Sequence, residues 1–443
     1  VKANGNAFRV VTGDFVTTED GTGIVHIAPT FGADDMKVGK ENGVDGILLK
    51  DRDGAMRPMV DLTGKYFRIE ELDPQFVENS MNADLYGEFA GRYVKNEYDD
   101  TLTEKDATLD VDLSVMLKMQ NRAFRIEKHV HNYPHCWRTD KPVLYYPLDS
   151  WFVRTTACRD KMIELNNTIN WKPQSTGTGR FGKWLENLQD WNLSRSRYWG
   201  TPLPIWRSED GREEKCIGSV KELYQEMQKS IDAGVMSELP WKGVSLSDYK
   251  DLDYEKIDLH RPYVDNIVLV SDSGKPMYRE TDLIDVWFDS GAMPFAQVFY
   301  PHIAEEEFQK VFPADFIAEG VDQTRGWFYT LHALASMVKG SVAFKNVVSN
   351  GLVLDKNGNK MSKRLGNAVD PFTTIEKYGS DPLRWYMITN AAPWENLRFD
   401  VEGVEEARRK FFGTLYNTYS FFVLYANVDD FRNQYPQIPV ENR

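Results

Sequence analysis

The run Lys360-Met361-Ser362-Lys363-Arg364 holds the side chains of this sequence that are best suited to binding a polyphosphate. It places three cations on a turn between an apolar segment at 352–354 and the string Gly366-Asn367-Ala368-Val369-Asp370-Pro371. Ammonium and guanidinium groups can neutralise the charge that grows on a departing pyrophosphate. A solvated basic turn without a ligand is the simpler alternative for three cations alone.

Acidic residues accompany two apolar segments at which we expect strands, over 316–319 and 285–288. The first segment runs into Glu319-Gly320-Val321-Asp322-Gln323. A carboxylate at a strand end can hold an ammonium group or a ribose hydroxyl, and a glycine there lets a ligand approach the backbone. Capping of the following helix by Asp322 is the alternative. The second segment continues into Asp289-Ser290-Gly291, and its tryptophan could be plain core.

The elements that must position these residues alternate along the chain. A helix is expected over 324–338 and a further strand over 345–354. Strands that alternate with helices indicate an α/β fold with a parallel sheet, and ligands bind such sheets at the carboxyl ends of the strands. Apolar residues at helical spacing predict a helix over 402–427.

The N-terminal part has a different pattern. Alternating residues over 8–16 and an apolar run at 24–27 predict two strands. Helices are predicted over 34–42 and over 74–85, and Asp73 would cap the second. Elsewhere, helices are expected over 157–166, 179–188 and 220–233.

Composition limits the classes to which the chain can belong. At 443 residues, 42% of them apolar, it is long enough for about three domains. Its apolar runs fall far short of the roughly 20 residues that a bilayer span needs, and no signal peptide is visible. Three cysteines predict no disulfide framework, so we expect a reducing cytoplasm. The net charge of −14 argues against a broad nucleic-acid surface, although local basic strips could still bind RNA.

Five strings together resemble isoleucyl-tRNA synthetases, which belong to class I of the aminoacyl-tRNA synthetases. The basic run resembles the KMSKS loop of that class, with Arg364 in place of the final serine. The other strings cover 195–206, 287–291, 319–327 and 378–386. The resemblance implies the C-terminal half of a Rossmann-like nucleotide-binding domain, preceded by part of a β-rich editing domain and followed by the start of an α-helical domain.

The resemblance also implies roles for individual residues. Lys360 and Lys363 would stabilise the pyrophosphate leaving group of ATP, which Mg²⁺ accompanies. Trp287 and Trp327 would line the isoleucine pocket, since flat indole walls can enclose a branched aliphatic side chain. Because the substrate carboxylate attacks the α-phosphorus, catalysis would be positioning and charge stabilisation. The residues implied to contact the adenylate or ATP are Glu319, Gly320, Asp322, Gln323, Lys360, Met361, Ser362 and Lys363.

The string at 21–35 resembles the end of the editing domain that isoleucyl, valyl and leucyl enzymes share. By resemblance, Asp35 would bind the amino group of the mischarged amino acid, and His26 would lie beside the ester. A histidine on a buried strand is the alternative for His26. A hydrophobic pocket separates isoleucine from valine by only ~1–3 kcal/mol, so a second, hydrolytic site is expected.

The cluster His129-x-His131-x-x-x-His135-Cys136 suggests a metal site, because imidazole and thiolate are zinc ligands. Members of the family often carry a zinc knuckle here, with Cys-Trp-Arg-Cys as one half. Thr139 stands at the second cysteine position and no other cysteine pair exists, so zinc is not expected and Cys136 is the remaining candidate. We expect the histidines to pack among Tyr133, Trp137 and Tyr145.

Six regions are expected from the resemblance. They are the C-terminal part of the editing domain (1–125), the return to the catalytic domain (126–206), a polar insertion (207–280), the Rossmann-like catalytic half with the signature loop (281–370), a stem-contact region (371–400) and the start of the helical anticodon-binding domain (401–443).

The expected activity is ATP-dependent ligation of isoleucine to tRNA-Ile with hydrolytic editing of Val-tRNA-Ile. The expected partners are tRNA-Ile, isoleucine and ATP, and we expect a cytoplasmic monomer. No His-x-Gly-His string occurs, so we expect an internal fragment that is inactive alone. The alternatives are a valyl-tRNA synthetase and a non-catalytic, synthetase-like RNA-binding protein. A hydrolase that uses Asp285 and Asp289 is a further one, but it explains neither the basic loop nor the tryptophan pair.

Overall fold

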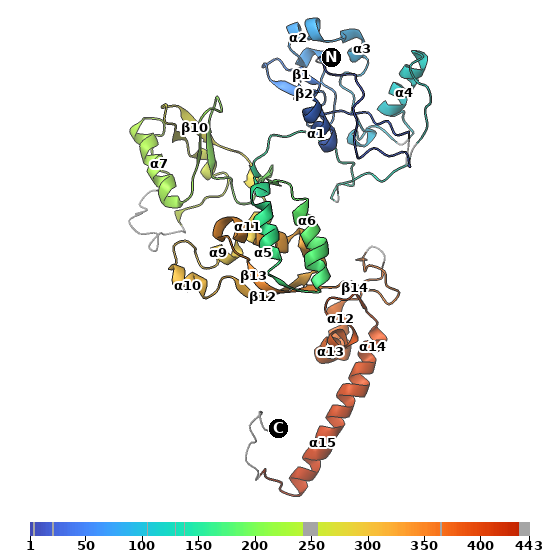
Figure 1. The fold of residues 1–443 in the computed structure, drawn as a ribbon, viewed down its shortest axis with the longest axis vertical. Helices are drawn as coiled ribbons and strands as arrows, with labels where there is room; N and C mark the ends of the chain where they lie inside the picture. Colours follow the sequence, from blue (N-terminus) through green and yellow to red (C-terminus); the bar gives the residue numbers. More distant parts are fainter. Residues whose placement is uncertain are drawn as a thin grey trace. The chain divides into compact units, whose positions relative to one another are not determined.

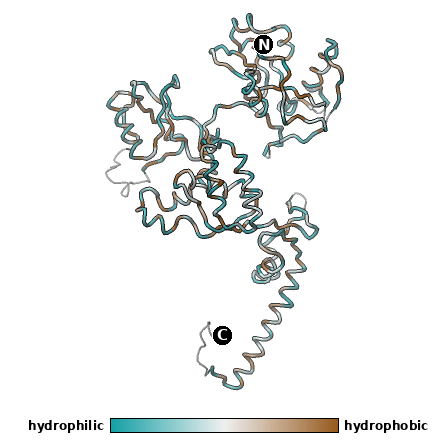
Figure 2. Tube along the Cα trace, viewed as in Figure 1, coloured by the Kyte–Doolittle hydropathy of each residue, from teal (hydrophilic) through white to brown (hydrophobic). Residues whose placement is uncertain are grey.

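The chain forms two compact units, Val1–Asp149 and Ser150–Arg443 (Figure 1). The computed structural model describes residues 1–2, 5–19, 22–103, 105–128, 130–136, 138–241, 256–363 and 366–433. Apolar and polar residues are interspersed along both units (Figure 2). None of the described helices combines the length and the apolar content that a membrane span requires.

In its described part, the first unit combines one antiparallel β-hairpin with short helices. The predicted helix over 34–42 is confirmed, and Asp73 does cap a helix, because it accepts a hydrogen bond from the Phe76 N–H at 2.8 Å. The predicted 74–85 helix is two helices, since Asn82 caps the second of them. The elements are α1 (Ala33–Asn42), β1 (Leu48–Lys50), β2 (Met56–Pro58), η1 (Ile69–Glu71), α2 (Pro74–Ser80), α3 (Ala83–Gly87), η2 (Asn96–Tyr98) and α4 (Leu109–Met119).

The strands predicted over 8–16 and 24–27 are wrong, and the described part of this unit is not β-rich. Alternation predicted half-buried strands, but Phe8, Val10 and Ile24 are 92%, 94% and 80% exposed. A strand also needs a neighbour that takes up its backbone hydrogen bonds. No described segment pairs with either stretch.

The second unit contains a parallel three-stranded sheet in the order β12–β13–β4. These strands are β12 (Ala314–Gly320), β13 (Phe344–Asn350) and β4 (Asn170–Lys172), and α11 (Trp327–Lys339) connects the first two. The register pairs Glu319 with Ser349 and Gly320 with Asn350, so β12 and β13 end side by side. The predicted α/β pattern with a parallel sheet is confirmed here.

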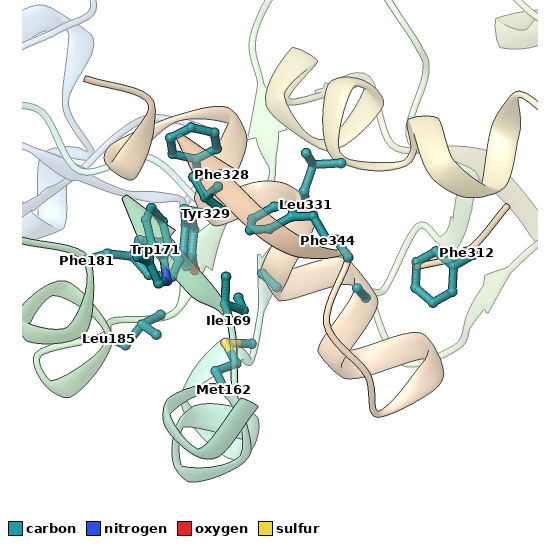
Figure 3. Packing of buried hydrophobic residues seen from close by; sticks show 14 of the residues in the cluster. Met162, Ile169, Trp171, Phe181, Leu185, Phe312, Phe328, Tyr329, Leu331 and Phe344 are labelled. Carbon is teal, nitrogen blue, oxygen red and sulfur yellow. The ribbon is translucent and has the colours of Figure 1, made fainter. Parts of the chain in front are cut away.

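An aromatic core holds the sheet against its helices. The ring of Trp171 lies 5.1 Å from that of Phe181, 5.7 Å from Phe328 and 6.4 Å from Phe344, measured between centroids. Figure 3 shows these side chains converging from separate segments of the chain. Burying each large apolar side chain stabilises the fold by about 1.5–3 kcal/mol. The helices α5 (Arg159–Asn166), α6 (Gly182–Glu186) and α11 therefore form one rigid support for the strand ends (Figure 1).

The stretch predicted as a strand over 285–288 is wrong, because a helix, α8 (Val286–Gly291), begins there. The Asp285 carboxylate accepts a hydrogen bond from the Trp287 N–H at 3.2 Å, which caps the first turn of α8. The strand β11 (Leu283–Ile284) ends immediately before it. The apolar run predicts a buried strand, but Val286 is 66% exposed and Trp287 is 41% exposed.

A second, antiparallel sheet has the order β8–β7–β10–β9 and packs against α7 (Val220–Asp232), which confirms the helix predicted over 220–233. Its strands are β7 (Ile205–Ser208), β8 (Glu214–Cys216), β9 (Leu269–Val270) and β10 (Pro276–Arg279). The smaller elements of the unit are β3 (Phe152–Val153), η3 (Thr155–Cys158), the π-helical η4 (Thr176–Phe181), β5 (Trp191–Asn192), β6 (Ser194–Arg195), η6 (Val264–Asn266), α9 (Met293–Ala296), α10 (Glu305–Gln309), η7 (Val321–Arg325) and β14 (Val353–Leu354).

The C-terminal part of the second unit is mainly helical. The helix predicted over 402–427 is confirmed as a continuous helical run with a π-helical turn inside it. A small core of Tyr378, Leu383, Leu397, Phe399 and Val404 joins its first turns to the preceding helices. The elements are α12 (Pro371–Tyr378), α13 (Ser380–Asn390), β15 (Leu397–Arg398), α14 (Val401–Glu406), the π-helical η9 (Ala407–Phe412) and α15 (Gly413–Val428).

Candidate active site

Two predicted carboxylates, Glu319 and Asp322, lie where β12 meets the short helix η7. A Cβ atom on Gly320 would lie 2.5 Å from Asp322 Oδ1, so only glycine lets that carboxylate fold back over the strand end. Both carboxylates are exposed, and Glu319 takes part in no ion pair among the described residues. The strand end therefore offers negative charge to a ligand, such as an ammonium group.

Gln323, and not Asp322, caps the following helix. Its Oε1 accepts a hydrogen bond from the Trp327 N–H at 2.9 Å, while its Nε2 donates to Asp322 Oδ2 at 3.1 Å. The capping alternative for Asp322 is thus wrong, because α11 has its cap from the neighbouring amide. Gln323 also fixes the orientation of the Asp322 carboxylate.

The two predicted pocket tryptophans lie at the junction of α8 and α11. The Trp327 indole N–H donates a hydrogen bond to the Ser290 carbonyl at 2.9 Å. A Cβ on Gly326 would lie 3.1 Å from Cη2 of Trp287, so that ring rests against the backbone just before α11. Trp287 is 41% exposed, which leaves part of its face open to a ligand.

A buried carboxylate below Trp287 supports this junction. Asp285 is 3% exposed, and its Oδ2 accepts hydrogen bonds from Arg195 Nη2 at 2.7 Å and Trp191 Nε1 at 3.0 Å. Its Oδ1 caps α8, so no oxygen is left for hydrolytic chemistry. For Asp289, burial raises the pKa of the carboxyl, and Thr201 donates a hydrogen bond to it at 3.2 Å. Because both oxygens of Asp285 are engaged in structural hydrogen bonds, the two carboxylates do not form the pair that the hydrolase alternative needs.

The signature loop is closed by one amide that we did not single out from the sequence. Asn367 Nδ2 donates to Asp355 Oδ2 at 3.0 Å and to the Lys360 carbonyl at 3.2 Å, and its Oδ1 accepts from the Ser362 N–H at 2.8 Å. The hydrogen bond from Asn367 lowers the pKa of Asp355, as do those from the Asn359 and Asn357 backbone N–H groups. The aspartate at the start of a turn that contains Gly358 is a sequence signal that could have identified this arrangement.

The cations of the loop remain accessible. Lys360 and Lys363 are exposed, and neither forms an ion pair with another described residue. Met361 packs against the C-terminal core, which anchors the loop between the two lysines. Arg364, the third cation, lies outside the described residues.

The predicted 345–354 strand is interrupted at Gly351, where a second backbone segment crosses. A Cβ there would lie 2.2 Å from the Glu395 carbonyl oxygen, and the Gly351 N–H donates to the Pro393 carbonyl at 2.9 Å. Asn396 Oδ1 accepts from the Leu352 N–H at 2.9 Å. These contacts fix the point at which the chain leaves the sheet toward the signature loop.

The predicted editing residues lie in the first unit. The Asp35 carboxylate, on α1, accepts a hydrogen bond from the Ala28 N–H at 2.8 Å. His26 is exposed and lies in the wall of a hollow of about 640 Å³, so the buried alternative for His26 is wrong. Asp35 is not part of that wall, and no described contact joins it to His26.

The candidate metal residues are occupied with local contacts. His131 and His135 each contact the ring of Tyr133 edge-on. A hydrogen bond with Thr139 lowers the pKa of the Cys136 thiol to about 7, with further backbone hydrogen bonds contributing. No group of three possible metal ligands comes together in the parts of the chain that the structure describes. His129 and Trp137 lie outside them.

The chain matches one family model and resembles several known proteins. The family model for class I tRNA synthetases (I, L, M and V) matches residues 49–400. The isoleucine–tRNA ligase of Porphyromonas gingivalis is 71% identical over 439 residues, and that of Bacteroides fragilis is 69% identical over 441 residues. Each match covers 99% of this chain and 39% of the relative. A solved structure of Mycobacterium tuberculosis methionyl-tRNA synthetase in complex with methionyl-adenylate matches 63% of this chain and 41% of that chain, with 17% identity and a TM-score of 0.40.

Proposed function

The chain belongs to the class I tRNA synthetases, and from that premise we propose that it forms the signature-loop part of an isoleucine–tRNA ligase. The proposed reactions are activation of isoleucine with ATP and transfer of the aminoacyl group to tRNA-Ile. The names of relatives with 69–71% identity support this assignment, although the chain spans only 39% of their length. A cytoplasmic location, a monomeric state and the six regional boundaries remain predictions.

The register of β12 and β13 is the observation that carries the proposal. Gly320 is paired with Asn350, so the turn with Glu319 and Asp322 stands beside the strand that leads to the signature loop. An aminoacyl-adenylate has an ammonium group and a ribose that suit exposed carboxylates, and a phosphate that suits exposed lysines. The carboxylates stand at the end of β12, and the lysines stand in the loop that follows its neighbour β13 along the chain.

In the proposed mechanism the isoleucine carboxylate attacks the α-phosphorus of ATP, and pyrophosphate leaves. Glu319 and Asp322 hold the ammonium group and the ribose, which orients the attacking carboxylate. Lys360 and Lys363 neutralise the charge that develops on pyrophosphate. Mg²⁺ would enter as the counter-ion of ATP and supply further charge neutralisation.

The specificity for isoleucine would come from the junction of α8 and α11. Trp287 and Trp327 offer flat apolar surfaces to a branched side chain. Isoleucine would bury more apolar surface against these rings than valine, which favours isoleucine. One methylene is worth only about 1–3 kcal/mol, so we also propose hydrolytic editing with His26 and Asp35. The hollow beside His26 supports a site of suitable size in the first unit.

Calorimetric titration of the 443-residue chain with isoleucyl and valyl sulfamoyl-adenosine, two stable adenylate analogues, tests the proposal. The isoleucyl analogue should bind roughly 10- to 200-fold more tightly. Trp287→Ala should remove most of this preference, whereas Trp199→Ala, which alters an exposed tryptophan stacked on His260, should not. Preference for the valyl analogue would indicate a valine enzyme. RNA binding without binding of either analogue would indicate the non-catalytic alternative.

A further inference from the structure

A basic hollow of about 460 Å³ lies next to the candidate active site and is not used by the proposed chemistry. Its wall contains two guanidinium groups, one ammonium group, an indole and an amide, but no carboxylate. This is notable in a chain with 67 acidic and 53 basic residues. The lining residues are Gly179, Arg180, Lys183, Trp184, Asn187 and Arg325.

The three cations have unused hydrogen-bonding capacity. Among the described residues, Arg180, Lys183 and Arg325 form no ion pair. The Arg325 guanidinium lies over the Trp184 ring at 5.2 Å, and Arg180 Nε donates to Thr324 Oγ1 at 2.9 Å. The remaining N–H groups of these two guanidinium groups have no carboxylate partner in the hollow. Guanidinium and ammonium groups only donate, so the hollow is rich in donors and poor in acceptors.

The indole in the wall of the hollow carries an unpartnered donor of its own. Trp184 Nε1 is buried and has no hydrogen-bond partner among the described residues. A buried donor without an acceptor costs about 1–3 kcal/mol, and native proteins seldom leave one unexplained. Because this atom is shielded from solvent, it faces the protein interior and does not itself contact a ligand in the hollow.

The position of the hollow relates it to the active site. Arg325 lies on η7 two residues after Gln323, and Arg180 holds the buried Thr324 between them. The short helix that presents Asp322 and Gln323 therefore presents Arg325 to the hollow. A group bound there would share one rigid element with the candidate adenylate site.

We propose that Arg180, Lys183 and Arg325 form a subsite for a phosphate group of the RNA backbone. The assignment rests on the proposed function, in which an RNA end must reach the adenylate. An overall charge of −14 repels RNA, so binding requires local neutralisation of phosphates by unpaired cations. Two guanidinium groups and one ammonium group can make charge-assisted hydrogen bonds to a single phosphate. The exposed lysines of the signature loop already suit the phosphates of ATP, which leaves this hollow for a different phosphate.

Fluorescence anisotropy of a labelled tRNA-Ile acceptor-stem RNA, titrated with the 443-residue chain at increasing salt, tests the subsite. The logarithm of the association constant falls with the logarithm of the salt concentration. Lys183→Gln and Arg325→Gln should each make this negative slope shallower by about 0.7–0.9, and each should weaken RNA binding roughly five- to tenfold at about 0.1 M salt. Both side chains are exposed, so the fold should persist, which circular dichroism can check. Lys221→Gln, an exposed lysine on α7, is the matched control and should leave the slope unchanged.

The other outcomes are equally decisive. Unchanged slopes in both variants, or no RNA binding by the unaltered chain, would overturn the subsite. Pyrophosphate is titrated into the same variants by calorimetry. Loss of pyrophosphate binding without loss of RNA binding would assign the hollow to a free polyphosphate and would also overturn the subsite. Binding of isoleucyl sulfamoyl-adenosine is measured on the same samples. If that analogue binds while the slopes stay unchanged, only the subsite fails; if the unaltered chain does not bind it, the proposed function fails.

Discussion

The side-chain amide of Asn367 donates a hydrogen bond to Asp355 Oδ2 at 3.0 Å, and this contact closes the signature loop onto the turn before it. The same amide contacts the Lys360 carbonyl and the Ser362 N–H, so one side chain reaches both the start and the middle of the basic run. Lys360 and Lys363 are exposed, and their positions depend on the backbone that Asn367 holds. The conformation of the loop therefore depends on a residue outside the signature pentapeptide.

Asn367→Ala should loosen the loop without unfolding the unit. It removes three hydrogen bonds, each of which contributes about 1 kcal/mol net, from an exposed segment that can open locally. Trypsin cleavage after Lys360 and Lys363 should accelerate roughly tenfold while the melting temperature changes little. Asn357→Ala in the neighbouring turn is the control, since no described contact depends on its side chain. Equal cleavage rates for Asn367→Ala and the unaltered chain would contradict the role of Asn367.

Gly291→Ala should destabilise the second unit. A Cβ atom at this position would lie 2.9 Å from the backbone of Thr330, so α8 would have to move away from α11. Overpacking of this kind costs about 1–3 kcal/mol, which urea unfolding can measure. Gly179→Ala is the matched control, because a Cβ there meets nothing within 4 Å. A free energy of unfolding for Gly291→Ala within error of the control would show that the helices accommodate a methyl group.

The sequence was sufficient for elements whose pattern is local. Strand β12, the helix after it and the long helix ending at Val428 all follow from local sequence patterns, which burial enforces in α11, whereas β12 and α15 contain no fully buried residue. The apolar run after Asp285 predicts a strand, but the structure has a helix there, whose first turn is capped by the Asp285 carboxylate. Alternation over 8–16 was misleading, since a strand depends on a partner that alternation cannot reveal.

Contacts between distant residues account for what the sequence could not predict at the site. Gln323 caps α11 although Asp322 is the more common residue type for that role, and the choice depends on how η7 turns. The ion pair of Arg195 and Asp285 joins residues far apart in the chain. The motif around Arg195 is visible in the sequence, but its pairing with Asp285 is not.

Arg195→Met should destabilise the second unit by about 2–4 kcal/mol, because it leaves the buried Asp285 carboxylate without its cation. Asp285→Asn in the same chain should recover much of this loss, since an amide is less costly to bury without a cation and keeps an acceptor for the α8 cap. Urea unfolding of the two single variants and the double variant gives the coupling energy. Arg384→Met is the control, because its pair with Asp381 is mostly exposed and should contribute less than ~1 kcal/mol. Additive effects of the two substitutions would mean that the pair is not coupled.

His332 should make the stability of the second unit depend on pH. The side chain is fully buried, Nε2 lies 2.9 Å from the Met162 carbonyl, and Nδ1 has no partner among the described residues. Burial lowers its pKa from 6.5 to about 4. Because the folded pKa lies below the unfolded one, the unfolded chain takes up a proton first as the pH falls. The contribution of neutral His332 to the free energy of unfolding is fully present above about pH 6.5. It is lost progressively toward pH 4, by up to roughly 3 kcal/mol.

Replacing His332 separates its effect on the pH dependence of the free energy of unfolding from the effect of the carboxylates. His332→Asn retains a donor that could face the Met162 carbonyl but cannot take up a proton. Between about pH 6.5 and pH 4.5, the free energy of unfolding of the unaltered chain should fall with pH more steeply than that of His332→Asn, by about 1.4 kcal/mol per pH unit at most. His302→Gln, at a half-buried histidine, should keep the His332-dependent part of the slope. If the free energies of unfolding of His332→Asn and the unaltered chain change in parallel with pH, the imidazole has the same pKa in the folded and unfolded states. That result would contradict the predicted effect of burial on His332.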